Sequence, residues 1–355
     1  MTTLTTVPSP TVSSPSTTSL LAEGDDVVAA PHRYRVLTGD RPTGRLHLGH
    51  YLGTLRERVR LQDAGVETFV VVADYQVITD RSDTSAVAAN VRELVLDYLA
   101  VGLDPLRTSI FRHSAVPEIG QLMLPLLSTA TLAELQRNPT VKAEAAHAGP
   151  LSALMLTYPV HQAADILSVG GTLVPVGDDQ LPHLEQTRVA ARRVNERYGA
   201  GAMVLTPPQA LLTQAPRLLG TDGQKMAKSR GNAIALAASE DETARLARSA
   251  VTDSERAVTY DPERRPEVAS LLLMGALCSG RSPQDVATDV GSGAARLKAV
   301  VTEAVNEHLR PIRARRRELE SQPDVVATAL AAGVERARPV AAATLARVNE
   351  AMGLG

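Results

Sequence analysis

The sequence predicts an α/β fold in which a doubly wound parallel sheet is followed by an all-α C-terminal region. Segments with strand character alternate with segments of helical periodicity from residue 33 to about residue 232. Such alternation is typical of a parallel sheet covered by helices on both faces. Beyond that point only helical patterns remain. The 355 residues, 44% of them apolar, suffice to bury the cores of two domains. We therefore expect a sheet domain over 33–232 and a helical domain over 233–355.

The first 32 residues differ in composition from the rest of the chain. They are rich in Ser, Thr and Pro and contain no Lys or Arg. Without a basic start they resemble neither a secretory signal nor a transit peptide, so we expect a disordered tail over 1–32. No apolar run approaches the roughly 20 residues of a membrane span. Cys278 is the single cysteine, which excludes an internal disulfide, and a cytoplasmic location is expected.

The elements of the sheet domain follow from periodicity and from helix-stop signals. The helical pattern that starts at Val87 ends at Gly102 with Asp104-Pro105 just beyond, as helices usually end. Strands are expected over 33–39, 68–73, 108–112 and 172–177, and helices over 46–62, 87–101, 118–137, 151–167 and 180–198. In the helical region we expect helices over 240–251, 267–278, 283–290, 294–320 and 325–352.

A glycine-containing turn with two histidines lies at the start of the helix predicted for 46–62. His47 and His50 are spaced three apart, so they share one face of a helix. Unpaired backbone N–H groups and the helix dipole favour an anion at such a position. The two imidazoles are therefore candidate donors to phosphate oxygens. A metal-binding pair or two surface histidines are the alternatives, but no third ligand lies nearby in the sequence.

A second motif, Lys225-Met226-Ala227-Lys228-Ser229, lies in a loop bordered by glycines. Only four of the 37 cationic residues are lysines, and two of them are in this loop, which is consistent with a need for compact, mobile ammonium groups. Such a loop can close over a triphosphate and neutralise a departing pyrophosphate. Taken alone, a mobile surface loop without function would be the simpler interpretation.

Together the two motifs resemble the signatures of the class I aminoacyl-tRNA synthetases. The segment from His47 to His50 is similar to the signature HIGH, and the lysine loop is similar to KMSKS, with Ala227 in place of Ser. The resemblance implies a Rossmann-like catalytic domain that activates an amino acid with ATP and transfers it to tRNA.

A third motif is similar to the tryptophan-specific, bacterial-type branch of that class. It comprises Thr157-Tyr-Pro-Val-His-Gln-Ala-Ala-Asp165 and Val174-Pro-Val-Gly-Asp-Asp-Gln180. Asp165 lies in an otherwise apolar helical pattern, where a buried carboxylate needs a partner. An N-cap or an ion pair with an arginine is the alternative to ligand contact. The resemblance implies that Asp165 accepts the indole N–H, which would also reject phenylalanine, since an unsatisfied group costs about 1–3 kcal/mol.

The resemblance covers nearly all of residues 33–355 and assigns the remaining site residues. The expected catalytic residues are His47, His50, Lys225, Lys228 and Ser229. The expected ATP-binding residues are Arg41, Gly49, His50, Lys142, Gly177, Asp179, Gln180, Lys225, Met226 and Lys228. The expected tryptophan-binding residues are Gln76, Tyr158, Gln162, Asp165 and Gln180. The resemblance further implies ATP with Mg²⁺, no metal held by the protein itself, tRNA(Trp) as partner, a homodimer and no membrane.

Several positions depart from the commoner bacterial pattern. Arg41 stands where those sequences have Gln, Gln76 where they often have His, and His161-Gln162 where they have Leu-Met. These positions surround the expected amino-acid and ATP pockets. We therefore expect an auxiliary subtype with altered sensitivity to inhibitors that mimic tryptophan.

The net charge of −2 gives no global attraction to RNA, so RNA binding must rest on a local basic face. The arginines between 310 and 317 could form such a face, but a solvated helix face paired with Glu318 and Glu320 is an equal alternative. Three other functions stay open: a tyrosyl-tRNA synthetase, a catalytically idle paralogue that binds tryptophan or RNA as a regulator, and an adenylyl transferase acting on a small acid.

Overall fold

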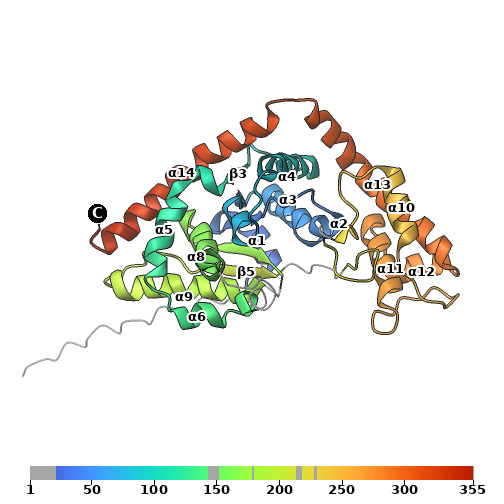
Figure 1. Cartoon of the computed structure of the whole chain (residues 1–355), viewed down its shortest axis with the longest axis horizontal. Coiled ribbons are helices and arrows are strands. Elements are labelled where there is room, and N and C mark those ends of the chain that lie inside the picture. Colours follow the sequence, from blue (N-terminus) through green and yellow to red (C-terminus); the bar gives the residue numbers. More distant parts are fainter. Residues whose placement is uncertain (1–20, 143–151, 178–179, 213–217, 228–229, 355) are drawn as a thin grey trace, which may run out of the picture.

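The computed structural model describes residues 21–142, 152–177, 180–212, 218–227 and 230–354 (Figure 1). At its centre lies a five-stranded parallel sheet with the strand order β3-β2-β1-β4-β5. The strands are β1 (Arg35–Asp40), β2 (Glu67–Val72), β3 (Thr108–Arg112), β4 (Leu173–Val176) and β5 (Gln209–Leu212). The predicted α/β class is confirmed. Because the strand order changes direction at β1, the carboxyl ends of β1 and β4 flank the topological switch point, where ligands bind in folds of this kind.

The helices of the sheet region connect these strands. They are α1 (Gly24–Ala29), α2 (Leu48–His50), α3 (Arg56–Asp63), α4 (Val87–Val101), α5 (Pro117–Leu127), α6 (Leu132–Arg137), α8 (Ala153–Ser168) and α9 (Leu181–Tyr198). Short helical turns are η1 (Pro31–Arg33), η2 (Tyr51–Leu55), η3 (Tyr75–Thr79) and η4 (His113–Ala115). The turn η2 is π-helical and joins α2 to α3. The C-terminal helices are α10 (Glu240–Ser249), α11 (Pro266–Ser279), α12 (Pro283–Val290), α13 (Ala294–Glu320) and α14 (Val325–Ala351).

The two faces of the sheet are buried in separate apolar clusters, as the alternation of side chains along β2 illustrates. Phe69 and Val71 belong to the cluster formed with α5, α8 and α9. Val70 and Val72 belong to the cluster formed with α4 and the residues between α2 and α3. Successive side chains of a strand point to opposite faces, so a strand covered by helices on both sides reads as a continuous apolar run.

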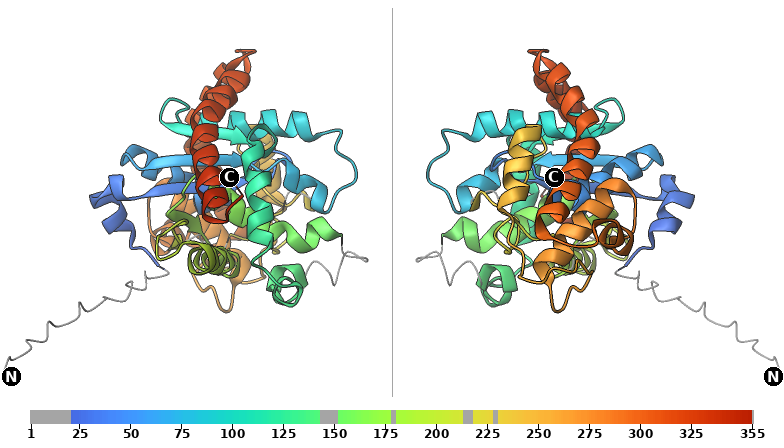
Figure 2. Two further views of the ribbon diagram at one scale, coloured as in Figure 1. Left: turned by 90° about the vertical axis from the view of Figure 1, so that its left-hand side faces the viewer. Right: turned by 90° about the vertical axis from the view of Figure 1, so that its right-hand side faces the viewer.

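The apolar core continues across the predicted domain boundary at residue 232. The cluster that contains Val70 also contains Leu246, Leu272 and Leu309 of the C-terminal helices. Helix α13 contacts α4, and the chain then turns back so that α14 runs along β3 and α5 (Figures 1 and 2). The domain boundary at residue 232 therefore remains a prediction. Residues from both sides of this boundary pack into the same apolar cluster.

Helix α14 lies against the backbone of the edge strand β3. A Cβ atom on Gly333 would stand 1.8 Å from the carbonyl oxygen of Ile110, so only glycine permits this approach. The guanidinium of Arg336 donates to Oγ of Ser109 (2.9 Å) and to the carbonyl oxygen of Thr108 (2.9 Å). An exposed strand edge invites pairing with other chains, and α14 covers this one.

Residues 21–32 are ordered, which corrects the prediction of a disordered tail over 1–32 for this part; residues 1–20 lie outside the described ranges. The backbone N–H of Ala22 donates to the carbonyl oxygen of Ala210 on the other edge strand, β5 (2.9 Å). Helix α1 follows and buries Val27 completely in a small apolar cluster with β1, β4 and β5. Because Ser, Thr and Pro dominate the first 32 residues as a whole, their composition did not indicate that Val27 is part of an apolar cluster.

The structure differs from the expectations at two further places. The helix expected over 118–137 is two helices, α5 and α6, because Thr131 starts α6 with a capping box: its hydroxyl accepts from the backbone N–H of Glu134, whose carboxylate accepts from the backbone N–H of Thr131. Strand β5 was not predicted. Within the described ranges, none of the helices has the length and apolar character needed to cross a bilayer.

Candidate active site

The predicted histidine motif follows directly on β1 at the switch point. His47 stands at the N-cap of α2, and the ring centroids of His47 and His50 are 3.7 Å apart. The backbone N–H of His47 donates to Nδ1 of His50 (3.3 Å), and His47 is 8% exposed. The structure therefore holds both imidazoles together at a helix N-terminus, which is where phosphate oxygens are favoured.

Two carboxylates, the half-buried Asp40 and the buried Asp97, support this turn. Asp40, at the end of β1, accepts hydrogen bonds from Nη1 of Arg58 (2.6 Å) and from the hydroxyl of Tyr98 (2.6 Å). Burial by itself would raise the pKa of Asp40, but the Arg58 guanidinium outweighs burial and holds that pKa well below its usual range. The carboxylate of Asp97 accepts from the backbone N–H of Leu46 (2.8 Å), the residue before His47. Burial raises the pKa of Asp97 to about 6, although the guanidinium of Arg316 opposes this.

The lysine loop is tied to the histidine turn through the backbone. The N–H of Leu48 donates to the carbonyl oxygen of Ile234 (2.9 Å), and the N–H of Leu236 donates to that of Leu46 (2.9 Å). This short antiparallel pairing holds the segment that follows the loop against the histidine turn. A Cβ atom on Gly49 would meet Sδ of Met226 at 3.2 Å, so the loop rests on the start of the helix.

Asn232 organises the lysine loop from within and was not predicted as a site residue. It is 2% exposed, and its amide donates to Oδ1 of Asp222 (2.7 Å) and to the carbonyl oxygen of Lys225 (3.1 Å). Its Oδ1 accepts from the backbone N–H of Ala227 (2.9 Å). Lys225 itself is exposed. Lys228 and Ser229 lie outside the described residues, so their roles stay predictions.

The predicted ATP-binding residues are only partly brought together. Gly177 follows β4 at the switch point, and its carbonyl oxygen accepts from the backbone N–H of Gln180 (3.0 Å) at the start of α9. Arg41 forms an ion pair with Asp80. Lys142 is exposed at the end of a described range. Asp179 lies outside the described residues.

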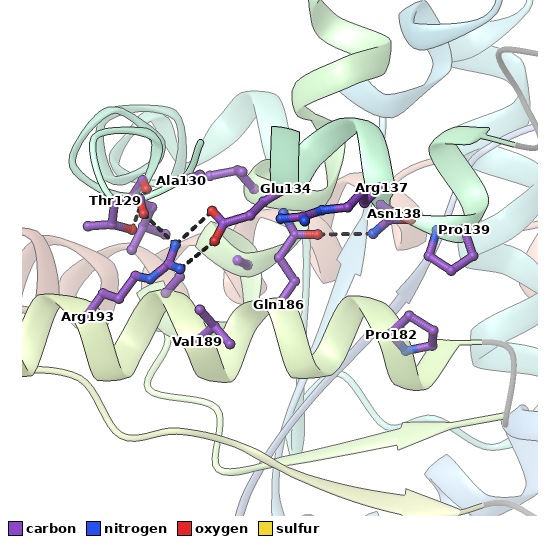
Figure 3. A pocket seen from close by; sticks show the side chains of 14 residues that line it. Thr129, Ala130, Glu134, Arg137, Asn138, Pro139, Pro182, Gln186, Val189 and Arg193 are labelled. Carbon is purple, nitrogen blue, oxygen red and sulfur yellow. Dashed lines mark hydrogen bonds and ion pairs between the residues drawn. The ribbon is translucent and has the colours of Figure 1, made fainter. Parts of the chain in front are cut away.

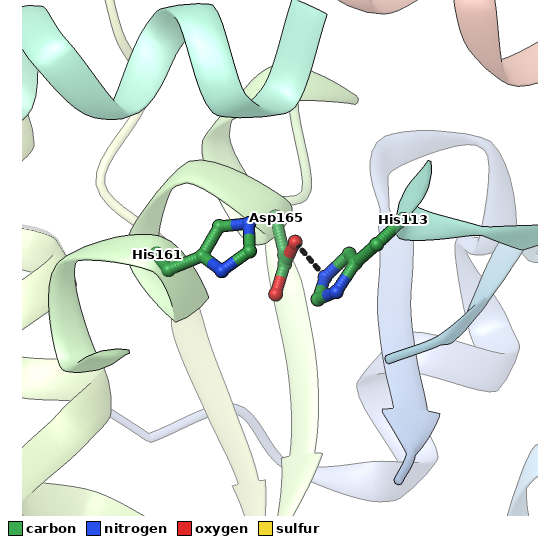
Figure 4. Close-up of side chains that lie close together, drawn as sticks. All are labelled: His113, His161 and Asp165. Carbon is green, nitrogen blue, oxygen red and sulfur yellow. Dashed lines mark hydrogen bonds and ion pairs between the residues drawn. The ribbon is translucent and has the colours of Figure 1, made fainter. Parts of the chain in front are cut away.

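Asp165 is buried beside the imidazole rings of His113 and His161 (Figure 4). His113, which the sequence analysis missed, forms a hydrogen bond with Oδ1 of Asp165 through Nε2. The rings of His113 and His161 are stacked with centroids 4.6 Å apart. Burial lowers the pKa of His161, although the charge of Asp165 opposes this. The expectation that a buried Asp165 needs a partner is confirmed, and the partner is a histidine instead of an arginine or an N-cap.

A signal for His113 was present in the sequence. It directly follows the predicted strand 108–112, and side chains at the carboxyl ends of parallel strands line the ligand crevice. Tyr75 extends the ring cluster, 6.4 Å from both imidazoles. Gln76 and Gln162 are half-buried. Tyr158 faces His183 on α9, with 3.4 Å between its hydroxyl and Nε2.

The side chains of His113, His161 and Asp165 are spaced closely enough to hold a metal ion, but the orientation of the two rings does not suit one. Its ligand atoms lie within 4.8 Å of one another. An imidazole lone pair lies in the plane of its ring, and the two rings are tilted by only 25°, so their lone pairs do not converge on one point. The arrangement favours hydrogen bonding to the carboxylate over coordination of an ion.

A cavity of about 260 Å³ lies elsewhere, between α5, α6, α8 and α9 (Figure 3). At its rim the carboxylate of Glu134 forms a bidentate ion pair with Arg193 (2.9 and 2.5 Å). Of the predicted site residues that the structure describes, none lines this cavity. It is therefore not the candidate active site.

The strand order, the two histidines at the helix start after β1 and the lysine loop paired with them define the architecture of a class I aminoacyl-tRNA synthetase. The model of the family of class I tRNA synthetases for W and Y matches residues 30–310. The chain is 44% identical to the tryptophan–tRNA ligase of Treponema pallidum, over 90% of this chain and 97% of that relative. It is 40% identical to that of Clostridium longisporum, over 90% and 96%. The tryptophanyl-tRNA synthetase of Campylobacter jejuni, complexed with ADP and tryptophan, superposes with a TM-score of 0.78 at 30% identity, covering 90% of this chain and 100% of that one. The chain belongs to the family of bacterial-type tryptophanyl-tRNA synthetases.

Proposed function

We propose that this chain joins tryptophan to tRNA(Trp) in two steps. The tryptophan carboxylate attacks the α-phosphorus of Mg–ATP; a carboxyl O–P bond forms, the bond to the bridging oxygen breaks and pyrophosphate leaves. A hydroxyl of the terminal adenosine of the tRNA then attacks the carbonyl carbon of the adenylate; an ester bond forms, the bond between that carbon and the phosphate oxygen breaks, and AMP leaves. The observation that carries the proposal is the backbone pairing of Leu46 and Leu48 with residues 234–236, which joins both signatures at the switch point.

The proposed roles follow from where charge develops. His47 and His50 donate to phosphate oxygens at the helix N-terminus, and Lys225, Lys228 and Ser229 contact the leaving pyrophosphate, with Lys142 as a further phosphate contact. Gly49, Gly177, Asp179, Gln180, Arg41 and Met226 bind the nucleotide. No group of the described residues is positioned as a covalent nucleophile, so the rate arises from positioning and from stabilisation of charge.

For the amino acid, we propose that Asp165 accepts the indole N–H. Its Oδ1 is engaged by His113, which leaves the other oxygen as the acceptor. Tyr158, Gln162, Gln76 and Gln180 complete the pocket. The tyrosine-specific alternative is disfavoured because the curated relatives cited above are tryptophan–tRNA ligases.

The test is tryptophan-dependent exchange of labelled pyrophosphate into ATP, with tyrosine and phenylalanine as controls. Exchange with tryptophan alone is expected. Lys225→Ala should slow exchange by about 100-fold or more while leaving tryptophan binding nearly unchanged, because the ammonium acts on the transition state. Lys298→Ala is the matched control, since Lys298 caps the carbonyl oxygen of Arg248 on the helical region (3.0 Å). Absence of exchange with every amino acid would favour the regulatory paralogue.

We also propose that the protein acts as a homodimer. Leu124 on α5 and Leu132 on α6 are 69% and 59% exposed. In this proposal the two leucines, which lie on helices consecutive in the sequence, contribute to the contact surface. Light scattering should show a dimer that Leu124→Asp together with Leu132→Asp dissociates. Leu106→Asp, at a still more exposed apolar site after α4, should leave the dimer intact.

A further inference from the structure

Five arginines line a second cavity, of about 400 Å³. It lies between the start of α10, helix α13 and Arg45, which precedes Leu46 and the two histidines. Its charged lining consists of Arg45, Glu240, Arg310, Arg313, Arg316, Arg317 and Glu320. The cavity is separate from the candidate active site, because none of the predicted site residues within the described ranges lines it.

Arg313 is the unusual member of this group. It is 5% exposed, and both of its terminal nitrogens are bonded to neutral groups: Nη1 to Oδ1 of Asn306 (2.8 Å) and Nη2 to Oγ1 of Thr243 (2.7 Å). Its buried Nε has no hydrogen-bond partner among the described parts of the chain. Among the residues that the structure describes, no carboxylate lies within ion-pair distance of Arg313. Burial lowers the pKa of Arg313 and the charge of Arg317 adds to this, although the more distant carboxylates of Glu240 and Glu242 oppose it.

The neighbouring Arg316 shows how a buried guanidinium is normally compensated. It is 2% exposed and pairs with Asp97, with Glu93 (2.8 Å) and with Glu320 (3.0 Å). The interpretation of the run as a solvated helix face therefore holds only in part: Arg310, Arg315 and Arg317 are exposed, whereas Arg313 and Arg316 are buried. A buried charge without such partners is unfavourable by several kcal/mol, so a missing anion is the physical expectation at Arg313.

Arg310 and Arg317 add positive charge to the cavity on the face of α13 that carries Arg313. Arg310, Arg313 and Arg317 recur at i, i+3 and i+7 on one face of α13. Arg310 is only loosely paired, at 3.4 Å from Glu240 and 3.7 Å from Glu307. Within the described ranges, Arg317 has no carboxylate at ion-pair distance.

We propose that this cavity binds a phosphate group, with Arg313 at its base and Arg317 and Arg310 at its rim. Guanidinium groups match the geometry of phosphate oxygens and form charge-assisted hydrogen bonds with them. The phosphate belongs either to the backbone of an RNA or to a free ion such as inorganic phosphate. Only the RNA source rests on the proposed function.

The first arm of the test uses inorganic phosphate with the nucleotide site saturated by Mg–ATP. Phosphate should raise the Tm of the wild type and of Arg315→Ala, an exposed arginine of α13 that does not line the cavity. The rise should fall by at least half in Arg317→Ala and in Arg313→Met. If Arg313→Met does not fold, Arg317→Ala alone decides, because its side chain is exposed.

The second arm measures binding of tRNA over a range of salt concentrations. If RNA supplies the phosphate, Arg317→Ala should bind about 10-fold more weakly, with a salt slope reduced by about one, and Arg315→Ala should bind as the wild type does. A loss in the phosphate arm alone assigns the site to the free ion. Equal behaviour of Arg317→Ala and Arg315→Ala in both arms overturns the proposal. Pyrophosphate exchange needs no RNA, so it separates this failure from a failure of the proposed function.

Discussion

The carboxylate of Asp165 on α8 and the imidazole of His113 after β3 form a hydrogen bond, and both side chains are almost fully buried. The two residues are 52 positions apart in the sequence. The bond fixes one oxygen of a carboxylate that we propose as the acceptor for the indole N–H, so His113 is a positioning residue for the amino acid.

Removing the donor at residue 113 should weaken tryptophan recognition. In His113→Leu, Asp165 stays buried without its hydrogen bond, which costs about 1–3 kcal/mol. The KM for tryptophan should rise by about 10- to 100-fold while the KM for ATP stays unchanged in pyrophosphate exchange. His113→Gln keeps an N–H donor and should restore most of the loss.

A tryptophan analogue with sulfur in place of the indole N–H provides the control. The analogue cannot donate to Asp165, so His113→Leu should impair its activation much less than that of tryptophan. Equal losses for both amino acids would mean that His113 has only a structural role.

Replacing Asn232 should loosen the lysine loop. Asn232→Ala removes the hydrogen bonds to Asp222, Lys225 and Ala227, so Lys225 is no longer held in position. We expect kcat for pyrophosphate exchange to fall by about 10-fold or more with little change in the KM for tryptophan. Gln224→Ala, at an exposed position of the same loop, should retain its activity. A change in the KM alone would contradict this role.

Asp40 should stabilise the fold only where it is ionised. Arg58 depresses the pKa of Asp40 in the folded state, so its contribution is complete above the unfolded pKa near 4, declines as the pH falls below that value and is lost entirely only below the depressed folded pKa. At pH 7, Asp40→Asn should lower the free energy of unfolding by about 3 kcal/mol, because Arg58 is left buried and unpaired. The difference from the wild type should shrink at pH 3.

Urea unfolding at both pH values measures this difference. Asp63→Asn is the control, because Asp63 pairs with Arg107 at a distance of 3.0 Å on the surface, with 59% of its side chain exposed. It should change the free energy of unfolding by less than about 1 kcal/mol at either pH. A constant effect of Asp40→Asn between pH 7 and pH 3 would show that the ion pair is not the cause.

Two truncations should distinguish the contribution of α1 to stability from that of residues 1–20. Removing residues 1–30 deletes α1 with the buried Val27 and uncovers the edge of β5. The Tm should fall by several degrees, since burial of one such side chain is worth about 1.5–3 kcal/mol. Removing residues 1–20 is the control and should leave the Tm nearly unchanged; similar Tm values for both truncations would argue against α1 as an anchor.

Most of the local structure could be predicted from the sequence because it depends on neighbouring residues. Helix α4 was predicted at its observed bounds from its periodicity and from Gly102, which stops it in a left-handed conformation (φ 112°). The short strand β5 could not be predicted, since four residues after two prolines become a strand only through pairing with β4. The sequence likewise indicated that Asp165 needs a partner, but the choice of His113 depended on packing α8 against the end of β3.

The sequence by itself determined the alternation of strands and helices and the residue types of the two signatures, because periodicity and short motifs are local properties. Only the tertiary structure decided that Ile234 and Leu236 pair with the histidine turn, that α14 returns to cover β3 at Gly333, and that Arg313 is buried with no carboxylate of the described residues at ion-pair distance. These three features join residues far apart in the chain. Which distant residues meet is decided by burial of the shared apolar core and by pairing of buried polar groups, and neither is encoded in any short stretch of the sequence.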